Sequence, residues 1–324
     1  MNGRQADSGN AGLKHLAFRI ATFRPNDYSK AIIFNEPEGN DKMLSTRPYL
    51  SLIQQAAQAA GIAVEPIDPD ILYRLTCGET SWVMYGVDPG LNDCTSFQLA
   101  KHKSAAYAVL ASSGVPAVPH HFVANPAYRR NGDGGIGTAL KWLKHYGNPL
   151  VVKPDDGSKG RQVSRVQDAD ELRLALDQLF ARFQHAAVSP FRQAEREYRV
   201  VVLDGMPKLM FSKLRADGEW RHNLALGARP GNVDPGLAPL LADLAVKAAA
   251  ALGLSFCTVD ILEICGAETG AQALEVLEVN GTVHLSEYMK HSDAARDAVY
   301  RLFLDVFRSK LNRLRPSAVQ QATS

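Results

Sequence analysis

The sequence predicts an α+β fold, and three observations support this class. Two β-rich runs, FCTVDILEI and ALEVLEVN, flank a Gly-containing loop, and two more flank an Asp204-Gly205 turn. Both arrangements are typical of antiparallel hairpins. Amphipathic helical patterns stand between and after these runs. With 324 residues and 46% hydrophobic content, the chain can bury a large core, so we expect two or three subdomains.

Composition argues against several classes of protein. A formal net charge of +2 on 22% charged residues gives no polyanion-binding signature, so we do not expect nucleic acid as a partner. No segment has the apolar length of a membrane span, and the polar first ten residues lack the apolar core of a signal peptide. Cys77, Cys94, Cys257 and Cys265 show no zinc-binding spacing, which favours reduced thiols in a cytoplasmic protein.

The first part of the chain, residues 13–94, mixes short apolar runs with one helical pattern. A helix is predicted from Pro48 to Ala60, where Tyr49 and Ile53 belong to an apolar stripe, and Gly61 closes it before the strand IAVEP. These patterns predict a small α/β domain, a common platform for a substrate. This part of the chain carries no recognisable catalytic motif.

A single helix is predicted next, from Thr95 or Ser96 to Gly114, followed by the extended segment VPAVP. Lys101 and Lys103 lie on this helix. A lysine on a helix is normally solvated, so the local pattern singles out neither of them.

The segment NPLVVKPDDGSKGRQV places Lys153 at the end of an apolar strand, before a turn that contains Gly157, Ser158, Lys159 and Gly160. Glycines let backbone N–H groups approach phosphate oxygens, and the two lysines add positive charge. The pattern is not Walker A. Taken alone, the segment favours an ordinary turn.

Later helices are predicted from their caps and apolar stripes. Asp168 or Asp170 caps one helix, and Asp234 caps a second that spans Pro235–Leu252 with proline at its first position. A last amphipathic helix is predicted over Ser292–Leu314.

Two cations stand in the β-rich region between these helices. Arg199 shares a strand face with Val201, and Lys213 shares one with Phe211. A charge among apolar residues needs an anion nearby or a solvated face, and a ligand phosphate or carboxylate is one such anion.

The hairpin of FCTVDILEI and ALEVLEVN suggests a metal site. A register that pairs Asp260 with Glu278 fits the loop length, and Asn280 then lies on the same face. Opposed carboxylates in an apolar context need a cation, and oxygen-only ligands suit Mg²⁺. The alternative is a solvated sheet face, which we expect for Glu263 opposite Glu275. The pattern alone leaves both interpretations of the Asp260 face open.

In this order the segments resemble the ATP-grasp superfamily, which includes glutathione synthetases, D-alanine ligases, cyanophycin synthetases and ribosomal-protein glutamate ligases. The resemblance covers roughly Thr95 to Tyr288. Its most specific parts are VVKPDDGSKGRQV, the loop GEWRHNLALGA, and VDILEI followed by LEVLEVNG. LAKHKSAAYAVLASSGVPAVP is similar to the family's helix with the first nucleotide lysine, which aligns with Lys103.

The resemblance implies an ATP-grasp fold of two α+β subdomains that clasp ATP. The expected parts are a tail (1–12), an N-terminal α/β domain (13–94), a small lid subdomain (95–188), a catalytic subdomain (189–314) and a second tail (315–324).

The resemblance also implies roles for individual residues. ATP ligands would be Lys103, Lys153, Gly157, Ser158, Lys159, Gly160, Ser189 and either Glu195 or Glu197. Two Mg²⁺ ions, for which Mn²⁺ can substitute, would be bound by Asp260, Glu278 and Asn280. Contacts to the transferred phosphate or acyl intermediate would come from Arg199, Lys213, Arg221 and Asn223. The family's Asn-x-x-Pro-Gly segment is replaced here by NGTVH.

The activity implied by the resemblance is ADP-forming ligation: a carboxylate attacks the γ-phosphate of ATP, and an amine attacks the resulting acyl phosphate. We expect small-molecule carboxylate and amine substrates. The alternatives are a protein-modifying amino-acid ligase and a catalytically silent ATP-binding protein. A homodimer is a family-level expectation.

Overall fold

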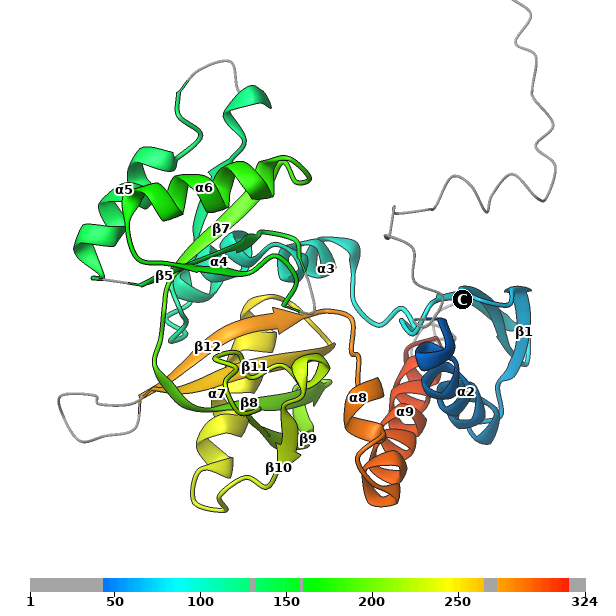
Figure 1. Cartoon of the computed structure of the whole chain (residues 1–324). Coiled ribbons are helices and arrows are strands. Elements are labelled where there is room, and N and C mark those ends of the chain that lie inside the picture. Colours follow the sequence, from blue (N-terminus) through cyan, green and yellow to red (C-terminus); the bar gives the residue numbers. More distant parts are fainter. Residues whose placement is uncertain (1–42, 129–131, 148, 158–159, 265–272, 315–324) are drawn as a thin grey trace, which may run out of the picture. The chain divides into compact units, whose positions relative to one another are not determined.

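A computed structural model of the chain describes residues 43–128, 132–147, 149–157, 160–264 and 273–314 (Figure 1). Ser158 and Lys159, Cys265, the centre of the predicted metal hairpin loop, residues 13–42 and both predicted tails lie outside the described residues.

The strands form three antiparallel sheets, of three strands (β1-β2-β3), four strands (β4-β7-β5-β6) and five strands (β10-β9-β8-β11-β12). The predicted α+β class is confirmed. The strands are β1 (Ala63–Asp68), β2 (Leu72–Cys77), β3 (Thr80–Tyr85), β4 (His121–Ala124), β5 (Leu150–Pro154), β6 (Ser164–Val166), β7 (His185–Pro190), β8 (Ala194–Leu203), β9 (Met206–Leu214), β10 (Arg229–Gly231), β11 (Phe256–Ile264) and β12 (Ala273–Asn280).

The predicted helices are present, but their boundaries differ from the predicted ones. The predicted final helix is α9, one residue shorter at its start, whereas the first described helix begins five residues before Pro48. The helices are α2 (Met43–Ala59), α3 (Cys94–Lys101), α4 (Lys103–Ser112), α5 (Ile136–His145), α6 (Ala169–Phe180), α7 (Ala238–Ala251), α8 (Ser286–Met289) and α9 (Asp293–Leu314), with short 3₁₀ turns η2 (Pro126–Tyr128) and η3 (Leu224–Leu226).

The four-stranded sheet has one face covered by α5 and α6 (Figure 1). Side chains alternate along β5, so Leu150 and Val152 enter the core beneath these helices. Val151 and Lys153 therefore point to the opposite face.

The five-stranded sheet is covered on one face by α7, against which Val200, Val259 and Ile261 pack. The opposite face of this sheet has an apolar end and a polar end. Its end near Val201 and Phe256 packs on α9, and its other end carries the polar side chains described below.

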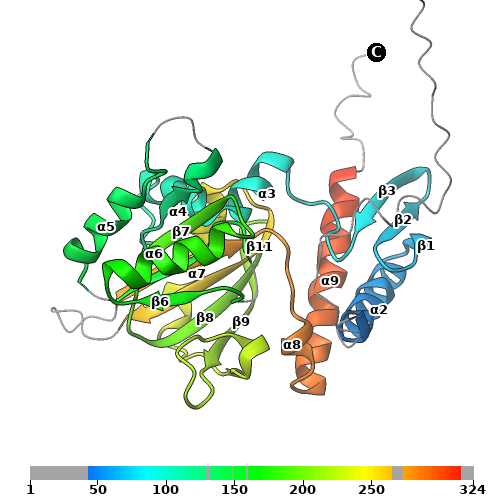
Figure 2. The same ribbon diagram turned by 45° about the horizontal axis from the view of Figure 1, so that its top comes forward.

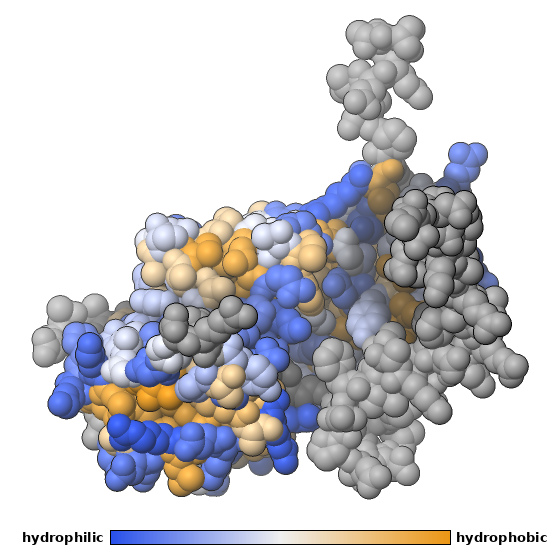
Figure 3. Space-filling view, turned by 90° about the horizontal axis from the view of Figure 1, so that it is seen from above, coloured by the Kyte–Doolittle hydropathy of each residue, from blue (hydrophilic) through white to orange (hydrophobic). Residues whose placement is uncertain are grey.

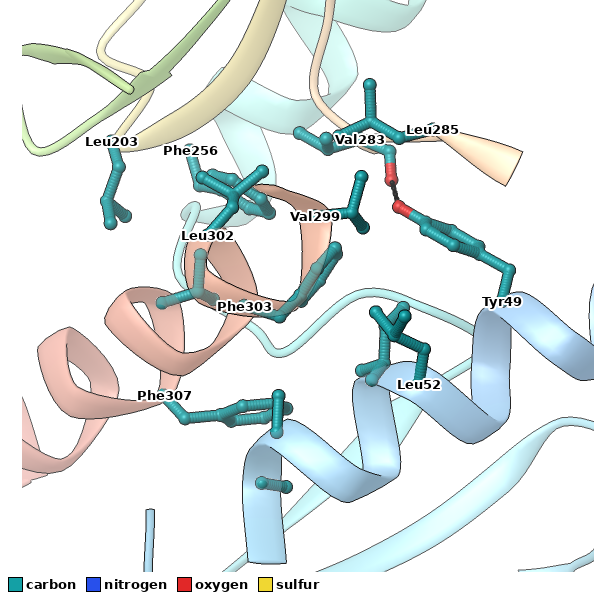
Figure 4. Close-up of a cluster of buried hydrophobic side chains, with 14 of the residues drawn as sticks. Tyr49, Leu52, Leu203, Phe256, Val283, Leu285, Val299, Leu302, Phe303 and Phe307 are labelled. Carbon is teal, nitrogen blue, oxygen red and sulfur yellow. Dashed lines mark hydrogen bonds between the residues drawn. The ribbon is translucent and has the colours of Figure 1, made fainter. Parts of the chain in front are cut away.

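Helix α9 also packs against α2, as Figures 1 and 2 both show. Phe303 of α9 makes edge-to-face contacts with Tyr49 and Phe256, both at 5.8 Å between ring centroids. The Tyr49 hydroxyl donates to the Val283 carbonyl at 2.8 Å (Figure 4). Helix α2 therefore holds the segment that follows β12.

The prediction of one helix from residue 95 to 114 is wrong. His102 has an extended backbone and separates α3 from α4, so that Lys103 becomes the first residue of α4. The reason is tertiary: the backbone N–H groups of Lys103 and Ser104 donate to Asp155, at 3.0 Å and 2.8 Å.

The predicted start of the helix at Pro235 is also wrong, because α7 begins at Ala238. The Asp234 carboxylate accepts from Gly236 N at 2.8 Å, which forms a local Asx turn in place of a helix cap. Asp168 is the cap of α6, since its carboxylate accepts from Asp170 N and Glu171 N.

The described surface mixes apolar and polar residues, and the view in Figure 3 shows orange patches between blue side chains. Exposed large apolar residues such as Tyr128 and Leu174 are normal when scattered. Among the described helices, none has the combined length and apolar character that crossing a bilayer requires.

Candidate active site

Four charged side chains from three neighbouring strands meet on the polar end of the five-stranded sheet. Arg199 on β8 pairs in register with Asp260 on β11, and Glu197 pairs with Lys213 on β9. Arg199 donates to the Asp260 carboxylate from Nε at 2.8 Å and from Nη2 at 2.7 Å, and Lys213 Nζ lies 2.9 Å from Asp260 Oδ2. Lys213 also pairs with Glu197. The anions that the sequence required for Arg199 and Lys213 are therefore carboxylates of the chain itself.

This cluster is buried, and burial separates the pKa values of its two carboxyl groups. Burial alone would raise the pKa of Asp260, but Arg199 and Lys213 outweigh it and hold the pKa well below its ordinary range. Burial raises the pKa of Glu197 to about 7, because Lys213 offsets it less and Asp260 adds repulsion.

The predicted pairing of Asp260 with Glu278 is confirmed by the strand register. On β12, Asn280 Nδ2 donates to Glu278 Oε1 at 3.2 Å. The three oxygen-bearing side chains therefore lie on one face of the hairpin.

The predicted pairing of Glu263 with Glu275 is wrong. An irregularity after Asp260 shifts the register, so that Glu263 pairs with Leu274 and Glu275 with Leu262. Glu263 is buried rather than solvated and accepts from the Tyr198 hydroxyl at 2.7 Å. Glu275 is in an ion pair with Arg192 at 2.7 Å.

The donor set on the Asp260 face fits a hard cation. Within the described residues, no group of three or more His, Cys, Asp or Glu side chains is arranged to hold a metal ion. A site there depends on the amide oxygen of Asn280 as third ligand. Asp260 accepts two hydrogen bonds from Arg199 and forms an ion pair with Lys213. Because a carboxylate offers about four lone-pair sites, it retains acceptor capacity for a metal.

Two further lysines, Lys103 on α4 and Lys153 on β5, lie outside the five-stranded sheet. Lys153 stands on β5 and is 7% exposed, and burial, assisted by Lys103, lowers its pKa to about 8. Glu278 and Glu197 act in the opposite direction. Lys103 Nζ donates to the Gly157 carbonyl at 2.5 Å, which places it beside the Gly-rich turn.

Asp155 is a residue that the sequence reasoning missed. Its carboxylate is 1% exposed, accepts from Ser104 N at 2.8 Å and lies 3.2 Å from His102 Nδ1. It thus joins the end of β5 to the start of α4, and so sets Lys103 relative to Lys153. Its position directly after β5, two residues beyond Lys153, was the available signal.

The loop GEWRHNLALGA contacts the Gly-rich turn. Arg221 Nη1 donates to the Gly160 carbonyl at 3.0 Å, and Glu219 holds the same guanidinium through Nε at 2.9 Å and Nη2 at 2.8 Å. Glu219 was also missed, although it stands two residues from Arg221. Gly160 has φ +66°, and a Cβ there would lie 2.9 Å from Asn223 Nδ2. A side chain at position 160 would therefore strain the backbone and displace the Asn223 amide, which favours glycine where the turn meets the loop.

The remaining candidates for ATP binding, Ser189, Glu195 and Glu197, differ in burial and position. Ser189 is buried on β7, opposite Val151 of β5. Glu195 is exposed at a register irregularity of β8, whereas Glu197 lies within the buried cluster. Of the two predicted acids, the structure brings only Glu197 to the polar face.

The sequence profile of the RimK-like ATP-grasp domain matches residues 101–299. The chain belongs to the RimK-like ATP-grasp family. This stretch contains every residue that the resemblance assigned to ATP, metal or phosphate contact. The predicted family, the ATP-grasp fold and the class of ligases that form C–N bonds are confirmed, and the fold implies ATP binding.

Relatives of this RimK-like chain are amino-acid ligases. It is 25% identical over 202 residues to a glutamate–LysW ligase ArgX of Sulfolobus acidocaldarius, covering 61% of this chain and 67% of the relative. It is 29% identical over 217 residues to a tetrahydromethanopterin:α-L-glutamate ligase of Methanosarcina acetivorans, covering 59% of this chain and 62% of the relative. The matches thus span about two thirds of each relative.

A solved structure supports the fold. The crystal structure of the D-cycloserine synthetase DcsG aligns with a TM-score of 0.50 at 22% identity, over 65% of this chain and 71% of that chain. At this identity the likeness shows the ATP-grasp fold alone.

Proposed function

We propose that this RimK-like chain activates a small-molecule carboxylate as an acyl phosphate with ATP and joins it to an amino group, releasing ADP and phosphate. The observation that carries the proposal is the polar sheet face on which Asp260 and Glu278 stand opposite each other beside Arg199 and Lys213. This face combines oxygen ligands for a cation with fixed cations for anionic groups.

Cations are needed because a carboxylate must approach the γ-phosphate. Two like charges about 4 Å apart repel by roughly 4 kcal/mol at an effective dielectric of 20. Lys103 and Lys153 would bind the ATP phosphates, and Arg199 would face the transferred group. Burial of Lys153 supports this role, since burial destabilises the ammonium and a phosphate nearby would stabilise it.

Asp260, Glu278 and Asn280 would hold Mg²⁺, with two ions expected and Mn²⁺ as substitute. Bound there, Mg²⁺ supplies neutralisation of the charge on the transferring phosphoryl group. Arg199 and Lys213 keep Asp260 ionised at neutral pH, so that it is ready to act as a ligand.

Arg221 and Asn223 would act in the second half-reaction. Arg221 is placed by Glu219 and by the Gly160 carbonyl. In this position it would stabilise the oxyanion that forms when the amine attacks the acyl phosphate. The Gly-rich turn would close over the phosphates, and Glu197 would be the acid nearest to the ribose.

The names of the relatives indicate the chemical class of the substrates but not the individual compounds. Both relatives are named for glutamate ligation, so we propose an amino acid as one substrate. A second candidate is ligation to an amino group of a polypeptide, because the loop GEWRHNLALGA resembles the protein-modifying members of the superfamily. The domain boundaries given above and the homodimer stay predictions.

The decisive experiment measures ADP and phosphate release from Mg·ATP by the purified chain, across a panel of amino acids and carboxylic acids, with mass spectrometry of the products. Acid-dependent ADP release with a new amide mass supports the proposal. A mass increase on an added polypeptide would favour the second candidate. ATP binding without turnover under every mixture would contradict both, and Glu278→Gln serves as the inactive control.

A further inference from the structure

Asn92 lies in the segment between β3 and α3, drawn in cyan in Figure 1. This segment precedes residues 101–299, which match the family profile, and neither the sequence motifs nor the proposed reaction gives Asn92 a role. Its half-buried side chain nevertheless reaches the start of β11 and the residue after β12, which lie 164 and 189 residues further along the chain.

The carboxamide of Asn92 makes four hydrogen bonds to backbone groups. Nδ2 donates to the Phe256 carbonyl at 2.7 Å and to the Gly281 carbonyl at 3.1 Å. Oδ1 accepts from the backbone N–H groups of Ser255 and Phe256, at 2.9 Å and 3.0 Å. An asparagine side chain offers two donor hydrogens and one oxygen with two lone pairs, so these bonds use its full capacity. An aspartate in this place would have no donor for the two carbonyls.

These bonds close the open end of the hairpin that carries the proposed metal ligands. At this end, the last pair in the β11–β12 ladder of the described residues is Thr258 with Asn280. Phe256 starts β11, and Gly281 directly follows β12. The Asn92 side chain therefore joins the two strands just beyond the last ladder pair, where the backbone bonds between them end.

Gly281 is restrained from a second side as well. A Cβ at Gly281 would lie 3.0 Å from Cδ2 of Phe97 on α3, so the backbone here lies close against the aromatic ring. Asn92 holds the carbonyl of Gly281, and Asn280 is the residue directly before it. The backbone position of Asn280 is therefore set by Asn92 and by the helix that follows it.

The segment with Asn92 is itself anchored on α9. Lys310 Nζ donates to the Gly90 carbonyl, and Arg313 Nη1 donates to the Leu91 carbonyl at 3.0 Å. The Leu91 side chain is buried in the apolar core. Asn92 thus contacts the hairpin from a position that the two preceding residues fix.

The proposed metal site is sensitive to the position of Asn280. Its Nδ2 donates to Glu278 Oε1, so its amide oxygen is the atom that would bind a cation. Mg²⁺ requires near-ideal octahedral geometry at about 2.0–2.1 Å, whereas Ca²⁺ accepts looser geometry at about 2.3–2.6 Å. Displacement of Asn280 should therefore weaken Mg²⁺ binding more than Ca²⁺ binding.

We propose that Asn92 is a positioning residue for the metal site: by holding the Gly281 carbonyl, it fixes the amide oxygen of Asn280 for Mg²⁺. The inference rests on the proposed function, because it needs a cation on the Asp260 face.

Calorimetric titration of ATP into the full chain tests the proposal, with saturating Mg²⁺, with saturating Ca²⁺ and with EDTA. The measured quantity is the metal effect, defined as the Kd for ATP in EDTA divided by the Kd with the metal. We expect Asn92→Ala to reduce the Mg²⁺ effect about tenfold or more, as is usual when a group that holds a metal ligand is lost. The Ca²⁺ effect should fall less, and the Kd in EDTA should stay unchanged.

Asn125→Ala is the matched control. Asn125 Nδ2 also donates to a distant carbonyl, that of Phe180 at 3.3 Å, and its Oδ1 accepts from Ala127 N at 3.0 Å. It directly follows β4 of the four-stranded sheet, so its loss should lower the melting temperature and preserve the Mg²⁺ effect.

Asn92→Asp is a second test variant. It keeps the size of the side chain and its acceptor bonds to Ser255 and Phe256, but it removes the donor to Gly281. We expect it to reduce the Mg²⁺ effect as well, and it decides the question if Asn92→Ala does not fold.

The outcomes separate this inference from the proposed function. A Mg²⁺ effect of unchanged size in the Asn92 variants would overturn the inference and leave the proposed function intact. Equal losses of the Mg²⁺ and Ca²⁺ effects, or unfolding of both Asn92 variants, would also overturn it, because Asn92 would then serve the fold alone. Absence of any Mg²⁺ effect in the unaltered chain would contradict the metal site of the proposed function, and the inference with it.

Discussion

Asp155 caps the first turn of α4 by accepting from Ser104 N at 2.8 Å, across 51 residues of sequence. This bond joins the strand that ends after Lys153 to the helix that starts with Lys103. The distance between the two proposed phosphate-binding lysines is thus set by a carboxylate that need not touch ATP.

Removal of this cap should weaken both the fold and ATP binding. We expect Asp155→Ala to lower the free energy of unfolding by about 1–2 kcal/mol, the usual cost of a lost cap, and to raise the Kd for Mg·ATP. Thermal denaturation and calorimetric titration measure the two effects. Asp156→Ala, at the exposed neighbour, is the matched control, and an equal loss of ATP affinity there would contradict the role of Asp155.

Glu278 should serve catalysis rather than stability. We expect Glu278→Gln and Asn280→Ala to lower turnover at least about a hundredfold, because bound metal contributes several kcal/mol of charge stabilisation. The melting temperature should change little, since the apolar side of the hairpin is intact. Glu275→Gln on the same hairpin is the control with turnover retained. Unfolding of both site variants would show that these residues are structural.

The pH dependence of ATP binding should report Lys153. Its pKa in the free chain is lowered to about 8, and nearby phosphate favours the charged form, so binding above this pKa requires proton uptake. We expect the Kd for Mg·ATP to be flat at neutral pH. It should then rise as the pH passes 8, by up to about tenfold per pH unit.

Lys153→Arg provides the control for this profile, because an arginine stays protonated throughout. Calorimetric titrations of both proteins from neutral to alkaline pH separate the outcomes. A rise of the same size in Lys153→Arg would mean that another group titrates.

Gly160 offers a test of the contact between the Gly-rich turn and the loop that carries Asn223. Gly160→Ala and Gly205→Ala both place a Cβ at positive φ, +66° and +73°, but only the first meets another atom within 4 Å. Both should cost about 1 kcal/mol of stability. Only Gly160→Ala should also reduce turnover, because the Asn223 side chain must move. Equal turnover of the two variants would rule out a functional contact.

The hairpin shows where sequence reasoning succeeded and where it failed. Alternation along two strands was enough to place Asp260 and Glu278 on one face, and the predicted register agrees with the observed pairing on the side of the irregularity away from the loop. The same counting failed for Glu263 and Glu275, since one irregularity after Asp260 shifts every later pair. Nothing in the local pattern announces such a bulge.

The break at His102 and the burial of His120 could not be predicted, for a different reason. Asp155 fixes the start of α4 from far along the sequence, and helix propensity reports only neighbours. His120 looks like a surface residue after a proline turn, yet it is 5% exposed. Burial of a polar residue depends on elements that pack over it, and those contacts are tertiary.

The bond from Tyr49 to the Val283 carbonyl bears on how this chain could be shortened. A fragment that begins at α3 would lack α2, and the faces of Phe303 and Phe307 that α2 and its neighbours bury would meet water. Large exposed apolar patches promote aggregation. The loop after Asn280 would also lose its anchor. We therefore expect a fragment that keeps the sheet with Asp260 in a folded state to need helix α2 as well.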